Sequence, residues 1–575
     1  MVYRGAQAPE LNGNTVVDSS SLDVTLSTVH HSATSWHKLA IADRVAILNE
    51  ILVDTVAISR EWTLAACEHK GLDPDAPEYG EELFAGVGTF VRLVRTFRDS
   101  LHDLDKSGRP HYPGPLKRHS NDRISVGVAP ANLFDRILYL GMSAEVWMQP
   151  GVDEQQVQEG QAMAYKPGGS TPGVCLVLGA GNVASLAPRD ALNQLFGENH
   201  TVLIKANPVN DYLVPYWERA MRALIAPGYL RIVKGDTAAG VYLTNHDLVD
   251  HIHITGSDKT YEAIVFGVGE EGKKNKEANR PVTTKHVSAE LGCVTPIVIL
   301  PGHWSTKQLK YQARHLATMF TNNDGFNCVT PRVIITHEQW PQREEFMGLF
   351  FEQLKQLPTR MAYYPGAWKR QAEFVASSRQ STKIGTENET TMAWTIVPDV
   401  DSSDVNNIAF NQEAWCSVIA QTSLRANSLE DFARAAARLC NEVLWGTLSA
   451  TVIAHPSTIK KLSNVVEELV GSLEYGTVGL NAWGAASLAF STSVWGAYPG
   501  HTATDIQSGT GFVGNAFMFS TAQKTVLRGA FRPLLTPSWF AGIKNSREIM
   551  ERFVRFEAAP SWLKIPALLR SALKG

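Results

Sequence analysis

The stretch Val174-Cys-Leu-Val-Leu178-Gly-Ala-Gly181-Asn182 sets the fold of this chain. Five apolar residues form a run of strand length, and a glycine turn with a polar residue ends it. A buried strand that leads into a glycine turn is typical of the first strand of a βαβ unit. We therefore predict a parallel sheet that begins at Val174.

Three further apolar runs follow, each starting roughly 20 to 30 residues after the previous one and separated from it by helix-like spans: 201–204, 230–233 and 251–255. A parallel sheet binds ligands at the carboxyl ends of its strands. Those ends carry Asn182, Lys205 and Thr255-Gly256-Ser257. A Gly-Ser pair that opens a helix offers N–H groups to a phosphate, so we expect a nucleotide here. The turn lacks the full G-x-G-x-x-G pattern, and a plain glycine turn remains the alternative.

The stretch Asn322-Asn-Asp-Gly-Phe-Asn-Cys328 joins an apolar helical run to a β-branched run, and a second α/β region follows it. A thiolate is accessible near neutral pH, so Cys328 at such a turn is a candidate nucleophile; a buried small hydrophobe is the alternative. Glu290 lies in an apolar strand-to-turn context. Such a context raises the pKa of a carboxylate and suits a general base, although a surface glutamate at a strand end is the commoner case when Glu290 is considered alone.

Other segments have weaker patterns. Apolar spacing predicts helices over 36–65 and 79–101, and short strand-like runs occur over 124–128 and 161–165. Polar and glycine content predicts an exposed hairpin or connector over 148–160, and charged residues with glycine predict a surface loop over 267–285.

The composition bounds the class of protein. The 575 residues suggest about two to four structural units, and 44% hydrophobic with 19% charged residues is typical of a globular protein. A net charge of −4 gives no reason to expect nucleic acid. Six cysteines without C-x-x-C spacing indicate no metal site and no disulfide framework. No run approaches about 20 apolar residues, so we expect a cytoplasmic protein without an integral membrane segment.

The motifs together resemble the aldehyde dehydrogenase superfamily from about Trp36 to about Arg528. The matching residues, in the family's order, are Asn182, Lys205, Thr255-Gly256-Ser257, Glu290-Leu-Gly, Asn323-x-Gly325-x-x-Cys328, Glu413 and Gly476-Thr-Val-x-x-Asn481. The resemblance implies an α/β fold with a Rossmann-like cofactor domain, a second α/β catalytic domain and a small oligomerisation element. The implied ranges are 1–142 with 170–291, 292–505, and 143–169 with 515–530, followed by a C-terminal extension over 531–575.

The resemblance also implies site residues. Cys328 would attack an aldehyde, Asn182 and the backbone N–H of Cys328 would hold the oxyanion, and Glu290 would activate water. The cofactor, NAD or NADP, would be bound by Lys205 at the adenine ribose, by Ser257 with the adjoining backbone of Thr255 and Gly256 at the pyrophosphate, and by Glu413 at the nicotinamide ribose. Pro208 replaces an acidic residue usual in the family, which leaves NADP open.

The expected activity is oxidation of a small-molecule aldehyde to a carboxylic acid. Two alternatives remain open: a coenzyme-A-acylating enzyme or acyl-CoA reductase, against which Glu290 argues, and a non-catalytic scaffold. The aromatic residues Phe326, Trp483 and Trp495 are expected near the substrate pocket and predict an apolar or aromatic substrate.

A homodimer or homotetramer is expected through the strand Gln523 to Arg528. The basic, aromatic extension is expected to pack over its own subunit or a neighbour's substrate entrance, with a membrane surface as the alternative.

Overall fold

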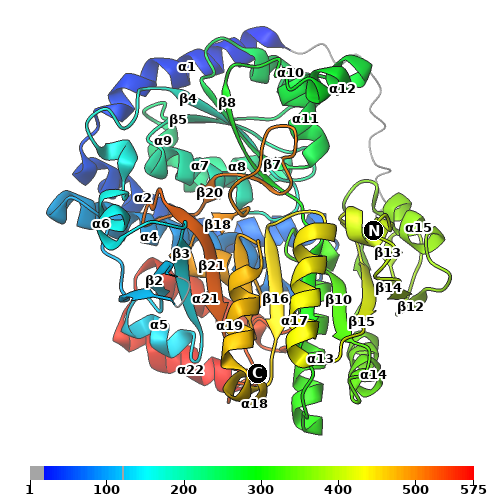
Figure 1. Cartoon of the computed structure of the whole chain (residues 1–575). Helices are drawn as coiled ribbons and strands as arrows, with labels where there is room; N and C mark the ends of the chain where they lie inside the picture. Colours follow the sequence, from blue (N-terminus) through cyan, green and yellow to red (C-terminus); the bar gives the residue numbers. More distant parts are fainter. Residues whose placement is uncertain (1–17, 120–121, 575) are drawn as a thin grey trace.

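The computed structural model describes residues 18–119 and 122–574. Two large sheets organise these residues and lie one above the other in Figure 1. The upper sheet has the strand order β19-β8-β7-β4-β5-β6, and the lower has the order β1-β2-β3-β21-β17-β16-β9-β10-β15-β14-β12. The α/β fold with two sheet-based units is thereby confirmed. Residues 1–17, which the predicted cofactor domain includes, lie outside the described residues.

The upper sheet confirms the βαβ prediction. Its strands are β4 (Val174–Leu178), β5 (Thr201–Lys205), β6 (Leu230–Val233), β7 (His251–Gly256), β8 (His286–Leu291) and the short antiparallel β19 (Gly509–Thr510). Strands β5 and β6 lie on one side of β4, and β7 and β8 lie on the other. Successive strands are therefore added first on one side of β4 and then on the other. The carboxyl end of β4 is the switch point in strand order, where α/β sheets bind ligands.

The helices of this unit are α7 (Leu186–Leu192), α8 (Val214–Ala220), α9 (Arg222–Ile225), α10 (Thr237–Asn245), α11 (Asp258–Phe266) and α12 (Gly269–Glu277). The predicted surface loop over 267–285 was wrong in part, because it contains α12. That helix is polar on nearly all sides, so it carries no apolar periodicity to detect. Lys276 of α12 forms an ion pair with Glu262 of α11 at 2.6 Å.

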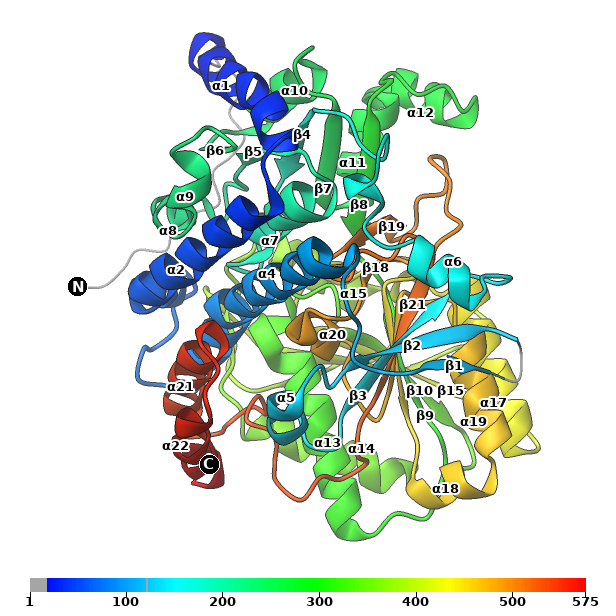
Figure 2. The same cartoon turned by 90° about the vertical axis from the view of Figure 1, so that its left-hand side faces the viewer.

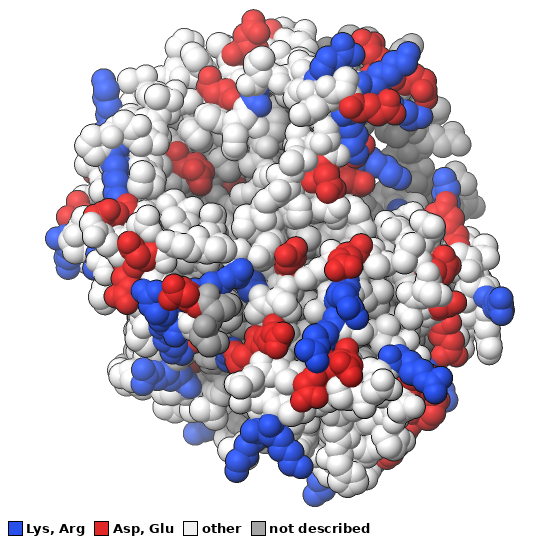
Figure 3. Space-filling view, viewed as in Figure 1, with Lys and Arg blue, Asp and Glu red and all other residues white. Residues whose placement is uncertain are grey.

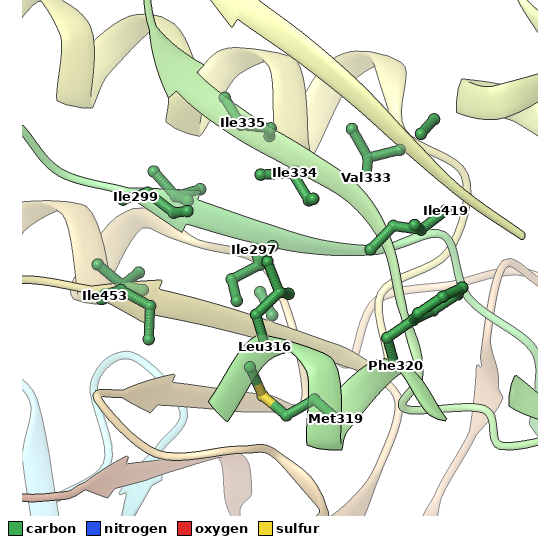
Figure 4. Close-up of a cluster of buried hydrophobic side chains, with 14 of the residues drawn as sticks. Ile297, Ile299, Leu316, Met319, Phe320, Val333, Ile334, Ile335, Ile419 and Ile453 are labelled. Carbon is green, nitrogen blue, oxygen red and sulfur yellow. The ribbon is translucent and has the colours of Figure 1, made fainter. Parts of the chain in front are cut away.

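The lower sheet has a parallel centre made of β9 (Thr295–Ile299), β10 (Pro331–His337), β14 (Trp394–Val400), β15 (Val418–Leu424), β16 (Ser449–Ile453) and β17 (Thr477–Leu480). The short β12 (Thr382–Ile384) pairs antiparallel with β14 at one end of the sheet. Apolar side chains of β9 and β10 pack against Leu316, Met319 and Phe320 of α13 (Thr306–Thr321), as Figure 4 shows. This buried contact fixes α13, which leads directly into the turn before Cys328. Helices α14 (Arg343–Lys355), α15 (Ala367–Ala376), α17 (Leu429–Arg438), α18 (Pro456–Lys461) and α19 (Ser463–Ser472) accompany the sheet.

One flank of the lower sheet contains the segments expected to make an oligomerisation element together with residues 116–129, which the predicted ranges placed in the cofactor domain. Strand β21 (Ala522–Arg528) pairs with β17 on one side and with β3 (Ser143–Met148) on the other, and β2 (Ile124–Ala129) and β1 (Leu116–Arg118) complete the flank. Both edges of β21 are thus hydrogen-bonded within the chain. The dimer prediction assumed that this strand would pair with another subunit, and the structure provides no free edge there.

The N-terminal helices are α1 (Ser19–His37), α2 (Ile41–His69), α3 (Glu78–Leu83) and α4 (Thr89–Ser107), with a π-helical segment over Phe84–Gly88. The predicted strand over 161–165 was wrong: Gln161 forms an isolated bridge to Phe519, and Met163–Tyr165 is a 3-10 turn. The connector over 148–160 contains the short helix α6 (Glu154–Glu159), which a capping box between Asp153 and Gln156 stabilises.

The C-terminal extension packs on its own subunit. Helix α21 (Ser546–Ala558) lies beside the N-terminal helices in Figure 2 and contacts α3 and α4, and α22 (Ile565–Leu573) packs on α21. Within the described ranges, no helix has the length and apolar character needed to cross a membrane. On the face shown in Figure 3, basic and acidic side chains are interspersed.

Candidate active site

A constrained turn presents Cys328. Asn323 (φ 50°), Asp324 (φ 54°) and Gly325 (φ 77°) have consecutive left-handed backbones. Each non-glycine residue in this region costs roughly 1–3 kcal/mol and persists only where its surroundings hold it. Here the Asp324 carboxylate accepts a hydrogen bond from Ser417 Oγ at 3.0 Å, and Arg332 donates to the Gly325 carbonyl at 2.5 Å. The turn is therefore fixed in the shape that precedes the cysteine.

The thiol of Cys328 faces the carboxylate of Glu290 at the end of β8. The distance from Cys328 Sγ to Glu290 Oε1 is 3.8 Å, and the same cavity is lined by both residues and by Asn182. Burial raises the pKa of Glu290, although Trp495, Arg189 and Cys328 partly oppose this. Burial, together with the carboxylates of Glu290 and Glu413, also raises the pKa of Cys328 well above its usual value. The cysteine therefore rests as a thiol beside a carboxylate placed to accept its proton.

Asn182 is held at both its backbone and its side chain. Its Nδ2 donates to the Phe326 carbonyl at 2.8 Å, which uses one of two amide hydrogens. Its backbone carbonyl accepts from Lys70 Nζ at 3.1 Å and from the Tyr363 hydroxyl at 2.9 Å. The amide thus has a fixed position in the cavity wall and a second N–H to donate.

Lys70, Glu82 and Tyr363 belong to this site, and the sequence reasoning missed them. Lys70 is 5% exposed, forms an ion pair with Glu82 at 2.7 Å and donates to Asn323 Oδ1 at 3.0 Å. Tyr363 donates to the same oxygen at 3.1 Å. The network joins the turn after β4 to the turn before Cys328. No local pattern marks Lys70, because its partners lie far away along the chain.

Four of the residues predicted to bind the cofactor, Lys205, Thr255, Gly256 and Ser257, lie at the carboxyl edge of the upper sheet, whereas Glu413 lies in the loop before β15 of the lower sheet. Lys205 ends β5 and is 9% exposed; burial lowers its pKa, and Asp236 and Asp211 oppose this. Gly256 and Ser257 are exposed at the start of α11. The Ser257 hydroxyl accepts from the Thr260 N–H at 3.2 Å, so it caps its own helix.

Two of these residues have other contacts. The Thr255 hydroxyl is buried and donates to Asp190 Oδ2 at 2.8 Å, and Thr255 is paired with Glu290 between β7 and β8. Glu413 lies against Gly292, where an added Cβ would come within 2.0 Å of Glu413 Oε2. Burial raises the pKa of Glu413 to about 7, while Arg332 opposes the shift. Of the three predicted aromatic pocket residues, Trp483 and Trp495 line the cavity, whereas Phe326 is buried behind it against Tyr363 and Tyr364.

Part of the chain matches a known protein-family model. Residues 170–366 match the model described as "Aldehyde dehydrogenase family". This part of the chain is therefore similar to that family. The matched segment contains Asn182, Glu290 and Cys328. No curated protein sequence matches the chain significantly.

Solved aldehyde dehydrogenases share the fold. Aldehyde dehydrogenase 21 from Physcomitrella patens, in complex with succinate, is 14% identical, with a TM-score of 0.60 over 89% of this chain and 90% of that one. Aldehyde dehydrogenase C from Pseudomonas syringae, a mutant in complex with NAD+ and octanal, is 14% identical, with a TM-score of 0.59 over 90% of each chain. The NADP-dependent glyceraldehyde-3-phosphate dehydrogenase from Bacillus halodurans, complexed with NADP, is 15% identical, with a TM-score of 0.59 over 89% and 92%.

Proposed function

We propose that the chain is an NAD(P)-dependent aldehyde dehydrogenase that oxidises an aldehyde to a carboxylic acid. The observation that carries this proposal is the 3.8 Å distance between Cys328 Sγ and Glu290 Oε1 in a cavity that Asn182 also lines. A nucleophile, a base and an amide donor converge there. A scaffold has no physical need for this set.

Each residue of the site has its own role in the reaction. Glu290 takes the proton of Cys328, and the thiolate attacks the aldehyde carbon, so that a C–S bond forms as the carbonyl π electrons move to oxygen. The resulting oxyanion accepts hydrogen bonds from the Asn182 amide and the Cys328 N–H. Bound NAD or NADP supplies the hydride acceptor. Loss of the hydride re-forms the carbonyl and leaves a thioester on Cys328, and Glu290 releases its first proton to solvent. Glu290 then deprotonates a water that attacks the thioester carbon. The C–S bond breaks, the acid leaves, and the Cys328 sulfur takes up the proton held by Glu290.

The residues at the carboxyl edge of the upper sheet fit a dinucleotide. Gly181 lies where any side chain would collide, because an added Cβ would meet Asn207 Oδ1 and Val209 at 2.8 Å. The exposed start of α11 presents N–H groups to a phosphate, although Asp258 in the first turn adds an unfavourable charge. Lys205 would bind a ribose, with the Thr255-Gly256 backbone and Ser257 near the phosphates and Glu413 at the nicotinamide side.

A turnover assay tests the proposal directly. The protein is mixed with NAD or NADP and a panel of aldehydes, with and without coenzyme A, and the absorbance of the reduced cofactor is followed. We expect repeated turnover without coenzyme A. A single burst that cycles only with coenzyme A would support the acylating alternative. Cofactor binding without any burst would support the scaffold.

We expect Glu290→Gln to slow steady-state turnover by about 10²–10⁴-fold, since general base catalysis contributes that much. Its raised pKa sets the sign of the pH dependence: wild-type turnover should fall as pH decreases through a value above 4.5, where the carboxylate becomes protonated. Stopped-flow absorbance and a pH profile measure both effects. The exposed Glu345→Gln is the matched control. An unchanged rate in Glu290→Gln would remove Glu290 from the mechanism.

We expect Lys205→Ala to raise the dissociation constant of the cofactor by about 10- to 100-fold, because hydrogen bonds from a charged donor are worth about 1.5–3 kcal/mol. Titration of protein fluorescence with NAD and NADP measures this, with Lys307→Ala on the exposed side of α13 as the control. Equal affinities in both variants would place the cofactor elsewhere.

A further inference from the structure

The C-terminal extension forms part of the cavity at Cys328. The cavity has a volume of about 140 Å³ and is lined both by Cys328 and by the segment 538–542 of the extension. Its other walls include Phe84, Leu186 and Trp483. An apolar protein cavity of about 150 Å³ stays dry and accepts a molecule of the size of benzene. The space beside the thiol therefore suits a hydrocarbon group of that size.

Hydrogen bonds fix this segment to the helix that leads to the nucleophile. The Ala541 N–H donates to Thr318 Oγ1 at 3.1 Å, and Arg314 donates to the Ala541 carbonyl at 2.9 Å. Thr318 and Arg314 both belong to α13. The wall formed by residues 538–542 therefore has a defined position relative to Cys328.

Aromatic contacts connect the same segment to the residue after Cys328. The Trp539 ring lies 5.7 Å from the Trp483 ring and 4.8 Å from the Phe540 ring, measured between centroids. The Trp483 indole N–H donates to the Val329 carbonyl at 2.8 Å. Trp539 thus limits the cavity at a fixed separation from the nucleophile.

The charges around the cavity favour a neutral ligand. Among the described residues that line it, the cation is Arg360, which is paired with Glu81 at 2.8 Å and lies 3.7 Å from Glu78. A substrate carboxylate or phosphate would meet these carboxylates and Glu290 without an unpaired cation to receive it. Such a charge would be costly to bury.

We propose that Trp539 is a specificity-determining residue and that the substrate is a neutral aldehyde with a hydrocarbon body of about six to eight carbons, a size set by the cavity. The aldehyde carbon lies at Cys328 and the hydrocarbon body extends toward Trp539. This inference rests on the proposed function.

The test replaces Trp539 by alanine and compares hexanal, decanal and succinic semialdehyde. We expect the wild type to prefer hexanal to the charged semialdehyde, and Trp539→Ala to raise the kcat/KM ratio of decanal to hexanal by about 10-fold or more, since several more methylenes then fit. Trp562→Ala is the matched control, because Trp562 is in the same extension and is 55% exposed. Its ring lies 4.6 Å from the Phe134 ring, between centroids, and does not line the cavity. A ratio unchanged in Trp539→Ala, an equal change in Trp562→Ala, or a preference for the semialdehyde would overturn the inference.

A binding measurement separates this inference from the proposed function. If the wild type oxidises no aldehyde, the function is wrong, and calorimetry with benzamide, a neutral and unreactive probe, still tests the pocket. Benzamide should bind the wild type and Trp562→Ala equally and Trp539→Ala about 10-fold more weakly. Equal binding by all three proteins, or binding by none, would contradict the assignment of Trp539 to the wall of the substrate cavity.

Discussion

Cys328→Ala is expected to lower aldehyde turnover by about 10⁴-fold or more while leaving cofactor affinity within about twofold, because loss of a covalent nucleophile removes a whole reaction path. The sulfur supplies the bond to the substrate carbon, and alanine cannot. The other five cysteines are buried, so none is available as a substitute. Steady-state rates and fluorescence titration of the cofactor measure the two quantities on the same protein.

The control for this prediction is Cys440→Ala, which removes a buried thiol from the core of the lower sheet. It should cost some stability and leave the rate per folded molecule unchanged. Retained turnover in Cys328→Ala would exclude the thioester path. Equal loss in both variants would instead indicate that the assay reports folding.

The resting geometry also predicts how Cys328 reacts. Its pKa is raised by burial and by two carboxylates, so a thiolate forms only as Glu290 accepts the proton. Glu290 must therefore be ionised before attack and again before hydrolysis. Both the attack and the hydrolysis should therefore slow as the pH falls and Glu290 becomes protonated. Glu290→Gln should accordingly lower the rate of the burst as well as the steady-state rate.

The βαβ strands were predictable because burial on both faces gives continuous apolar runs. Val174 to Leu178 and Leu230 to Val233 coincide with β4 and β6. The grouping of Asn182, Glu290 and Cys328 was predicted from the resemblance to aldehyde dehydrogenases, because Cys328 precedes β10 of the other sheet and the strand-end rule does not reach it. For the strands alone, a local pattern together with a general rule of sheet topology was sufficient.

The remaining features depend on contacts between distant segments. Lys70 lies at the end of a long helix, and only the packed structure brings it to Asn182 and Asn323. Strand β21 has a clear strand pattern, but the pattern does not specify its neighbours. The cavity wall at Trp539 lies in a segment without regular structure, so no periodicity marked it.

A buried ion network attaches the extension, and its disruption should have the second large effect. Arg92 lies 2.7 Å from Asp135 and 2.9 Å from Glu557, and Arg95 lies 2.5 Å from Glu557. All four side chains are at most 8% exposed. Glu557→Gln removes one charge and leaves buried guanidinium groups undercompensated. The expected loss is about 3–5 kcal/mol in the free energy of unfolding, as for other buried pairs broken on one side.

Denaturant unfolding measures this loss, with Glu551→Gln as the control on the same helix. Glu551 pairs with Arg547 at 3.2 Å with both side chains about one-third exposed, and such pairs contribute at most about 1 kcal/mol. A loss below about 1 kcal/mol in Glu557→Gln would mean that water or another donor compensates the network.

The network also connects stability to substrate choice. The segment 538–542 shortly precedes α21, so loosening of α21 should open the cavity before the two sheets unfold. At denaturant concentrations below the main transition, the decanal to hexanal ratio should therefore rise in Glu557→Gln and stay constant in Glu551→Gln. A ratio that changes only together with global unfolding would show that the extension and the sheets form one cooperative unit, in which case Trp539 can act only as a fixed wall.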